Sequence, residues 1–194
     1  MDNSVIYDFE TLSQDQMSGV VTCLAILKFD ESRFVDKSYT FKELVNSAKV
    51  MKFSVEEQVK TYERKIDKST LDWWKEQGPD AQKWIKPSDD DRGLEELYDF
   101  FMEAAGGHAT KFYTRGNTFD PILLESIMKQ THKPMPYHWW EVRDTRSLIE
   151  GLSWGSKLEN KFIPPGCDEL VKHNPTHDIA LDVMRIQALA QAIQ

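Results

Sequence analysis

The chain has 194 residues, 40% of them hydrophobic, and a formal net charge of −8 at pH 7. This length suits one globular domain that buries about 70% of its unfolded surface, so we expect a single domain over residues 1–194, and the acidic balance argues against a protein that coats nucleic acid through bulk positive charge. Two isolated cysteines, no basic-then-apolar leader and no apolar run of about 20 residues argue against a disulfide framework and a membrane protein, so we expect a cytoplasmic location.

The chain opens on a strand-like stretch, SVIYDFETLS, at residues 4–13. Side chains alternate between the two faces of a strand, so Asp8 and Glu10 point to the same side near the strand's end. Two carboxylates at the end of an apolar strand need a cationic partner. Such an acidic site can hold metal ions and can then face a phosphodiester despite the negative net charge.

Two further strands are predicted next. Residues 19–30 form a largely apolar run, and residues 37–46 (KSYTFKELVN) alternate in part, so three neighbouring strands suggest an antiparallel meander. The chain turns helical from Val55. A short helix is then predicted to start at Ser69 or Thr70 and to end near Gly78 and Pro79.

The second half alternates strands and helices. A polar stretch at 86–93 leads into a helix at 94–105, and the aspartates of that stretch miss the EF-hand pattern because the glycine stands one position too early. Residues 110–130 predict a strand, a glycine turn and a helix, residues 136–152 a shorter strand and helix, and residues 176–194 a final helix. This order predicts an α/β domain with a mixed sheet.

Acidic residues stand out in three of these elements: Asp8 with Glu10, Asp120 before a proline, and Asp182 in the final helix. Each has a structural alternative. Asp120 can simply cap the helix that begins with Pro121. Asp8 and Glu10 can be solvated if their strand lies at a sheet edge, although its apolar sequence favours a central position.

The final helix distinguishes two aspartates. At 100° per residue, Asp182 lies about 60° from the centre of the apolar stripe, whereas Asp178 lies about 100° away, where solvent or a helix cap is the expected environment. We therefore favour Asp182 as the functional acid. His177 converges with Asp182 only if it lies on the loop that enters the helix, and a surface or capping role is the usual alternative for a lone histidine.

The order of these groups, D-x-E, then F-D before a helix, then H-x-x-x-x-D, resembles the DEDDh group of DnaQ-like 3'-to-5' exonucleases. Within that group, the chain is similar to the branch that holds the exonucleases A of large tailed phages and small bacterial exoribonuclease domains. The segments that carry the resemblance are DFET (8–11), STLDWWKEQGPDAQ (69–82), FDPILL (119–124), RDTRS (143–147) and HDIALD (177–182). They extend over nearly the whole chain.

The resemblance implies an RNase H-like fold, with a five-stranded mixed sheet whose first strand is central and flanked by helices. It also implies that Asp8, Glu10, Asp120 and Asp182 bind two divalent ions, Mg²⁺ or Mn²⁺, and that His177 is the general base. The chemistry agrees, because two hard cations about 4 Å apart activate water, stabilise a leaving 3'-oxygen and need clustered oxygen ligands. An imidazole with an ordinary pKa of about 6.5 accepts a proton near neutral pH.

Several residues are candidates for substrate contacts. By the same resemblance, Phe9 and Thr11, which flank the acids, are expected to meet the terminal nucleotide. The neighbours Trp73 and Trp74 predict one core side chain and one half-covered side chain, and Trp74 is our candidate for base stacking, with packing as the alternative. Three arginines can clamp phosphate or pair with nearby acids such as Asp144. They are Arg115, Arg143 and Arg146.

The sequence therefore predicts a metal-dependent 3'-to-5' exonuclease that releases 5'-mononucleotides from single-stranded ends, with DNA preferred over RNA. Three alternatives stay open: an exoribonuclease, a hydrolase of very short oligonucleotides, and a nucleic-acid-binding protein of the same fold without catalysis. A homodimer is also compatible with the apolar faces of the central and C-terminal helices.

Overall fold

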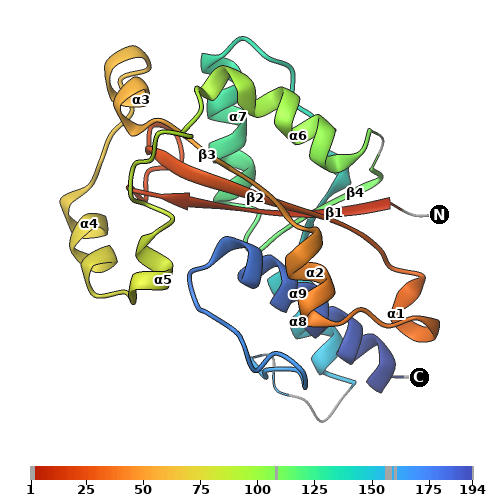
Figure 1. Ribbon diagram of the computed structural model, residues 1–194. Coiled ribbons are helices and arrows are strands. Elements are labelled where there is room, and N and C mark those ends of the chain that lie inside the picture. Colours follow the sequence, from red (N-terminus) through yellow and green to blue (C-terminus); the bar gives the residue numbers. More distant parts are fainter. Residues whose placement is uncertain (1–2, 108, 156–158, 160, 194) are drawn as a thin grey trace.

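A five-stranded mixed sheet forms the centre of the computed structural model, which describes residues 3–107, 109–155, 159 and 161–193 (Figure 1). The strands lie in the order β3–β2–β1–β4–β5. Their bounds are β1 Asn3–Thr11, β2 Val21–Asp30, β3 Lys49–Lys52, β4 Lys111–Thr114 and β5 Val142–Asp144. The predicted central position of the first strand is confirmed, because β1 pairs antiparallel with β2 and parallel with β4.

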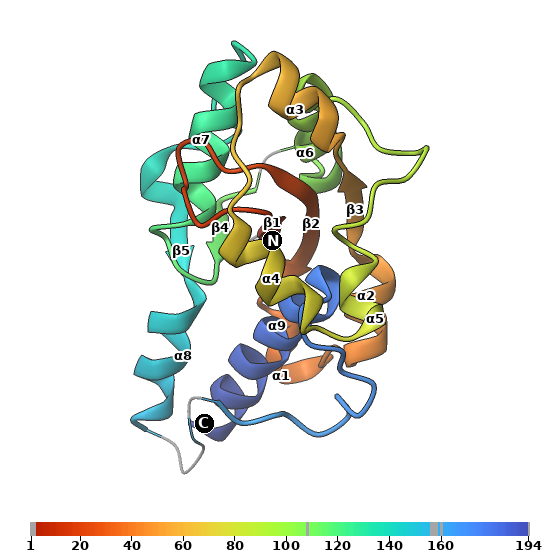
Figure 2. The ribbon, with the colours of Figure 1, turned by 90° about the vertical axis from the view of Figure 1, so that its left-hand side faces the viewer.

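Helices cover both faces of this sheet (Figures 1 and 2). On one face lie α6 (Leu97–Ala105) and α7 (Asp120–Gln130), and on the other lie α2 (Phe41–Ser47), α8 (Thr145–Ser153) and α9 (Pro175–Ala192). The shorter helices are α1 Arg33–Asp36, α3 Val55–Thr61, α4 Lys68–Lys75 and α5 Pro79–Gln82, and single 3₁₀ turns are η1 Leu94–Glu96 and η2 Trp139–Glu141. None of the described helices combines the length and the apolar character that a membrane span requires.

The alternation of side chains along β1 divides the core into two layers. Val5, Tyr7 and Phe9 pack into the cluster beneath α6 and α7, whereas Ile6 packs into the cluster beneath α9. Asp8 and Glu10 follow Ile6 at the period of two, so they continue its face toward α9. The strand thus carries its carboxylates to the edge of the apolar layer that α9 covers.

The predicted strand at residues 37–46 is wrong. Residues 41–47 form α2, because the Thr40 side chain accepts a hydrogen bond from the backbone N–H of Glu43 at 3.1 Å and caps the helix. Phe41 and Leu44, three residues apart, are both buried on the face that meets the core. The third strand, β3, follows this helix and pairs antiparallel with β2. The predicted antiparallel meander is therefore present, but its third strand lies later in the sequence than expected.

A smaller unit made by α4 and α5 lies beside the end of β1, at the left of Figure 1. α4 begins after Asp67, two residues before the predicted cap, and Pro79 starts α5 as the next element. A separate apolar cluster joins this unit to the loop after β1 through Leu12, Val20, Trp74 and Ala81. The unit therefore forms a wall next to the strand end that carries the acids.

Candidate active site

Three carboxylates meet where the end of β1 faces the first turn of α9. One oxygen from each of Asp8, Glu10 and Asp178 can be chosen such that all three lie within 4.8 Å of one another. Asp178 is thus not solvated, and the prediction of a solvated or capping role for it is wrong. α9 begins at Pro175 after an Asn174 cap, and this start places Asp178 in the turn that faces the strand end.

Asp120 approaches the same place from the other face of the sheet. It is the first residue of α7 and is only 3% exposed. Its carboxylate accepts a hydrogen bond from the backbone N–H of Phe9 at 3.1 Å, so the side chain reaches β1 instead of capping its own helix. The hydrogen bond fixes Asp120 beside the peptide that links Asp8 to Glu10.

The crowding of these acids changes their proton affinity. Burial, and after it the charge of Asp120, raises the pKa of Asp8 well above its usual range, while burial and the charge of Asp178 do the same for Glu10. Burial raises the pKa of Asp120 to about 7, and burial together with Asp182 raises the pKa of Asp178 to about 7. Four carboxylates so placed repel one another unless protons or cations balance their charge.

Asp182 lies one helical turn beyond Asp178 and has partners of its own. Its carboxylate accepts hydrogen bonds from Arg115, from the Thr145 hydroxyl at 2.5 Å and from Arg185 at 3.4 Å. The side chain is buried, as its position beside the apolar stripe predicted. Its negative charge is paired by Arg115 and Arg185. The side chain lines one cavity with Asp8, Glu10 and Asp178, and its role as a metal ligand stays a prediction.

The two histidines near the start of α9 face different surroundings. The Nδ1 atom of His177 accepts a hydrogen bond from the backbone N–H of Val171 at 3.0 Å, and its ring packs edge-on against Phe41 at 5.3 Å. The structure therefore holds His177 against α2. His173 instead lines a cavity of about 350 Å³ together with Asp8, Glu10 and Asp178.

The backbone at His173 supports a special role for this residue. Its φ of +59° lies in the left-handed region, which non-glycine residues adopt at a cost and which often marks functional sites. Its backbone N–H donates to the Asp178 carboxylate, and this hydrogen bond links the acid to the loop that precedes α9. Sequence reasoning missed this pair although a signal was present, because the spacing H-x-x-x-x-D occurs twice, as His173 to Asp178 and as His177 to Asp182.

A second cavity, of about 400 Å³, adjoins the first and shares Phe9 and Glu10 with it. α4 forms its other wall. The predicted contact residues Phe9 and Thr11 both line it, together with Gln14, Ser69, Thr70, Trp73 and Trp74. An extended ligand can therefore pass from this cavity to the acids without leaving the cleft.

The two tryptophans of α4 divide as the sequence predicted, into one core and one half-covered side chain. Trp74 is 2% exposed, and its indole N–H donates to the backbone oxygen of Thr11 at 2.9 Å. Trp73 is 41% exposed, and its ring packs edge-on against His173 at 4.8 Å. The free face needed for base stacking therefore belongs to Trp73, and the choice of Trp74 for that role is corrected.

Of the three candidate arginines, Arg115 alone lines either of the two cavities that the described residues form around the acids. Arg143 lies in β5, where its guanidinium donates to the backbone oxygens of Trp140 and Val142. Arg146 lies on the exposed side of α8. Asp144 pairs with neither guanidinium, because its carboxylate caps α8 through the backbone N–H of Arg146 at 2.9 Å.

Comparisons with known proteins agree with this geometry. The family model of the 3'-5' exoribonuclease Rv2179c-like domain matches residues 3–193. The exodeoxyribonuclease of Enterobacteria phage T4 is 32% identical over 201 residues, which cover 94% of this chain and 86% of that protein.

Solved structures of Escherichia coli exonuclease I in complex with single-stranded DNA share the fold. The zinc-bound form has a TM-score of 0.60 at 12% identity over 99% of this chain, and the metal-free form has a TM-score of 0.59 at 13% identity over 100% of it. The match covers 40% of each of those chains, so this chain spans less than half of their length. The predicted RNase H-like fold is confirmed.

Proposed function

The chain belongs to the family of 3'-5' exoribonuclease Rv2179c-like domains, and we propose that this 3'-to-5' exonuclease uses two divalent ions, Mg²⁺ or Mn²⁺, to hydrolyse single-stranded DNA to 5'-mononucleotides. The observation that carries the proposal is the meeting of Asp8, Glu10 and Asp178 within 4.8 Å. DNA is favoured because the phage T4 relative is an exodeoxyribonuclease. RNA is the second candidate, since the family model describes an exoribonuclease domain.

The acids fit a site for divalent metal ions. Asp8, Glu10 and Asp178 offer clustered carboxylate oxygens, which hard cations prefer, and Asp120 stands beside them. The raised pKa values of all four acids mark a place where added positive charge relieves repulsion. When bound, divalent ions lower the pKa of water and stabilise the charge on a leaving oxygen.

In this proposal the general base is His173, whereas the family resemblance implied His177. It lines the cavity of the acids, and burial together with the nearby Lys172 lowers its pKa below the ordinary value. The imidazole is therefore neutral at pH 7 and free to accept the proton of an attacking water. The hydrogen bond from its backbone to Asp178 keeps it beside the acids.

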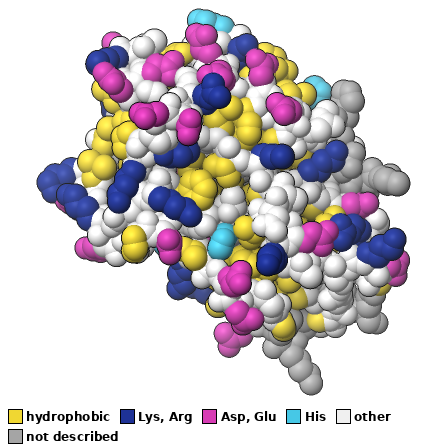
Figure 3. Space-filling view, in the orientation of Figure 1, with side chains coloured by type: hydrophobic (Ala, Val, Ile, Leu, Met, Phe, Trp, Pro, Cys, Tyr) yellow, Lys and Arg dark blue, Asp and Glu magenta, His cyan; other side chains and the backbone are white. Residues whose placement is uncertain are grey.

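The second cavity is the place for the terminal nucleotide. Phe9 and Thr11 line this cavity, and the half-exposed Trp73 offers a ring for base stacking. Arg115, Lys172 and Arg185 line the neighbouring cavity and supply positive charge for a phosphate. Figure 3 shows further Lys and Arg side chains over α4 and α5, so a cationic surface exists beside the cleft despite the net charge of −8.

A time course on 5'-labelled single-stranded DNA and RNA of matched sequence tests the proposal. The experiment compares the wild type with Asp8→Asn and Asp178→Asn in Mg²⁺, Mn²⁺ or EDTA. The exposed Asp99→Asn on α6 serves as the matched control. We expect a ladder that shortens from the 3' end only with metal, a loss of at least about 100-fold in both site variants, and an unchanged rate in the control.

Two results contradict the proposal. Degradation in EDTA at the wild-type rate would exclude a role for divalent ions. Full activity of Asp178→Asn would exclude the acid cluster as the reactive site. The faster of the two polymers decides between DNA and RNA.

A further inference from the structure

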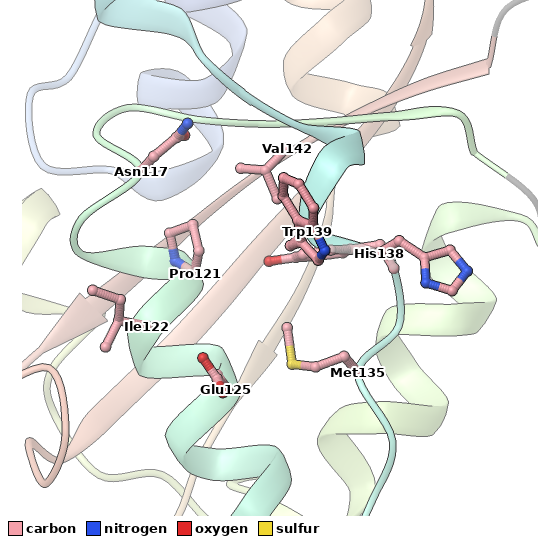
Figure 4. A pocket seen from close by; sticks show the side chains of 9 residues that line it. Asn117, Pro121, Ile122, Glu125, Met135, His138, Trp139 and Val142 are labelled. Carbon is pink, nitrogen blue, oxygen red and sulfur yellow. The ribbon is translucent and has the colours of Figure 1, made fainter.

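A third cavity lies behind the start of α7, on the side away from α9, and has a volume of about 500 Å³ (Figure 4). Pro121, Ile122 and Glu125 of α7 form one side, and Trp139 and Val142 face them from the segment that leads into β5, as Figure 4 shows. Asn117, Met135, Tyr137 and His138 complete the lining. The lining is mostly apolar, and nothing in the active site described above uses it.

Two tryptophans next to this cavity are exposed. Trp139 is 82% exposed and Trp140 is 55% exposed, although large aromatic side chains normally contribute to a core. The Trp140 ring stacks on His138 with the ring centres 4.3 Å apart and the planes 9° apart, so these two rings are ordered by each other. The 3₁₀ turn η2 thus exposes the faces of aromatic rings at the rim of the cavity.

One exposed cation, Arg143, stands beside the tryptophans. The guanidinium of Arg143 donates to the backbone oxygens of Trp140 at 2.7 Å and of Val142 at 2.8 Å, which fixes an exposed cation beside the tryptophans. Glu125 pairs with Lys129 at 2.6 Å, and Glu141 accepts a hydrogen bond from the backbone N–H of His138 at 2.7 Å. Each of these two carboxylates thus has a hydrogen-bonding partner within the chain, although both keep their negative charge.

The cavity is close to the acids. Val142 pairs with Phe112 in β4, and Phe112 pairs with Val5, which stands three residues before Asp8 in β1. The backbone positions of Val142 and Asp8 are therefore about 14 Å apart, which is the sum of two strand spacings across the sheet and three residues along it, taken at right angles. Pro121, which lines the cavity, directly follows Asp120. A polymer whose end lies at the acids can therefore reach the cavity within a few units.

We propose that this cavity, with Trp139, Trp140 and Arg143, binds single-stranded nucleic acid upstream of the nucleotide that is removed. The proposal rests on the proposed exonuclease function and adds a second point of contact for the strand. Bases stack on the exposed indoles, and a phosphate meets the Arg143 guanidinium, which is the combination used by proteins that bind single strands without sequence preference. The site makes the enzyme prefer long strands over short ones.

The test compares substrates of two lengths. The value of kcat/KM is measured for a trinucleotide and for a twelve-nucleotide strand with the wild type, Trp139→Ala and Arg143→Ala. Trp154→Ala is the matched control, because Trp154 is 83% exposed at the end of α8 and does not line the cavity. We expect both cavity variants to lose about 10-fold on the long strand, with the trinucleotide unchanged within about twofold and the control unchanged on both.

Equal losses on both lengths, or no loss on the long strand, would overturn the proposal. Binding of a fluorescent twelve-nucleotide strand in EDTA, followed by anisotropy, gives a readout that does not depend on hydrolysis. We expect Trp139→Ala to raise the Kd at least about fivefold relative to Trp154→Ala. An unchanged Kd contradicts the subsite, whereas a wild type that binds the strand but cleaves neither length contradicts only the proposed exonuclease function.

Discussion

His173 and His177 are four residues apart, and their contacts place them in different surroundings. His173 lines the cavity of the acids, whereas His177 packs on Phe41 and accepts a hydrogen bond from Val171. We expect His173→Ala to lower kcat by about 100-fold or more, the usual range for a lost general base, and His177→Ala to keep kcat within about threefold. Single-turnover rates on labelled DNA at saturating enzyme measure this difference. Equal losses in the two variants would refute the assignment of the base to His173.

The acids show which part of a site can be predicted from local spacing. Asp8 and Glu10 were identified because a strand puts residues two apart on one face, and both now stand in the cluster. The structure adds Asp178 to this cluster, whereas the sequence favoured Asp182 alone, because the two were ranked by their distance from the apolar stripe of one helix. A ranking along one helix does not include Arg115, Thr145 and β1, the distant parts of the chain that surround the two aspartates.

At the scale of elements, α4 carries two adjacent tryptophans that differ in burial. Trp74 is buried and donates to the Thr11 oxygen, so Trp74→Phe leaves that oxygen without its partner. We expect this variant to lower the free energy of unfolding by about 1–3 kcal/mol. Trp73→Phe, at the half-exposed neighbour, is the matched control and is expected to change it by less than about 0.5 kcal/mol. Urea unfolding followed by circular dichroism distinguishes the two, and equal destabilisation would contradict the division of roles.

The elements also show why one strand was mispredicted. Residues 37–46 alternate in part, which is the pattern of a half-buried strand. The same residues contain Thr40 followed three positions later by Glu43, and that backbone N–H is capped by the Thr40 side chain. The capping signal outweighed a weak alternation. Where the pattern was strong, as in β1, β2, α7 and α9, the elements appear where the sequence placed them, within a few residues.

At the scale of the whole molecule, the fold assembles the site from distant parts of the chain. The acids come from the end of β1, the start of α7 and the start of α9, and Arg115 follows β4, which lies parallel to β1. Parallel strands end on the same side of a sheet, and the helices that follow them start there. The sequence singled out Asp8, Glu10 and Asp120, and the sheet order β3–β2–β1–β4–β5 brings them together with Asp178. The resemblance to a known family predicted five strands with the first one central, and the structure supplies the rest of the order.

The acid cluster makes the stability of the whole molecule depend on pH and on metal. The pKa of Asp178 and of Asp120 is raised to about 7 in the folded chain, above the ordinary value of 3.8. Protonated acids thus favour the folded state, so this contribution is complete below about pH 4 and is lost as the pH rises through 7. In EDTA we expect the Tm to fall between pH 5 and 8.

Asp178→Asn removes one of the repelling charges and should therefore raise the Tm in EDTA at pH 8. The expected shift is about 2–4 °C for each kcal/mol by which the free energy of unfolding increases. Mn²⁺ should raise the Tm of the wild type at pH 8, because an ion that binds the folded chain stabilises it, and should raise the Tm of Asp178→Asn less. Asp99→Asn should behave as the wild type throughout. Thermal melts in EDTA and in Mn²⁺ measure both effects. A Tm that is independent of pH in EDTA and unmoved by Mn²⁺ would mean that the four acids neither repel one another nor bind the ion, and the metal-dependent mechanism would then have lost its physical basis.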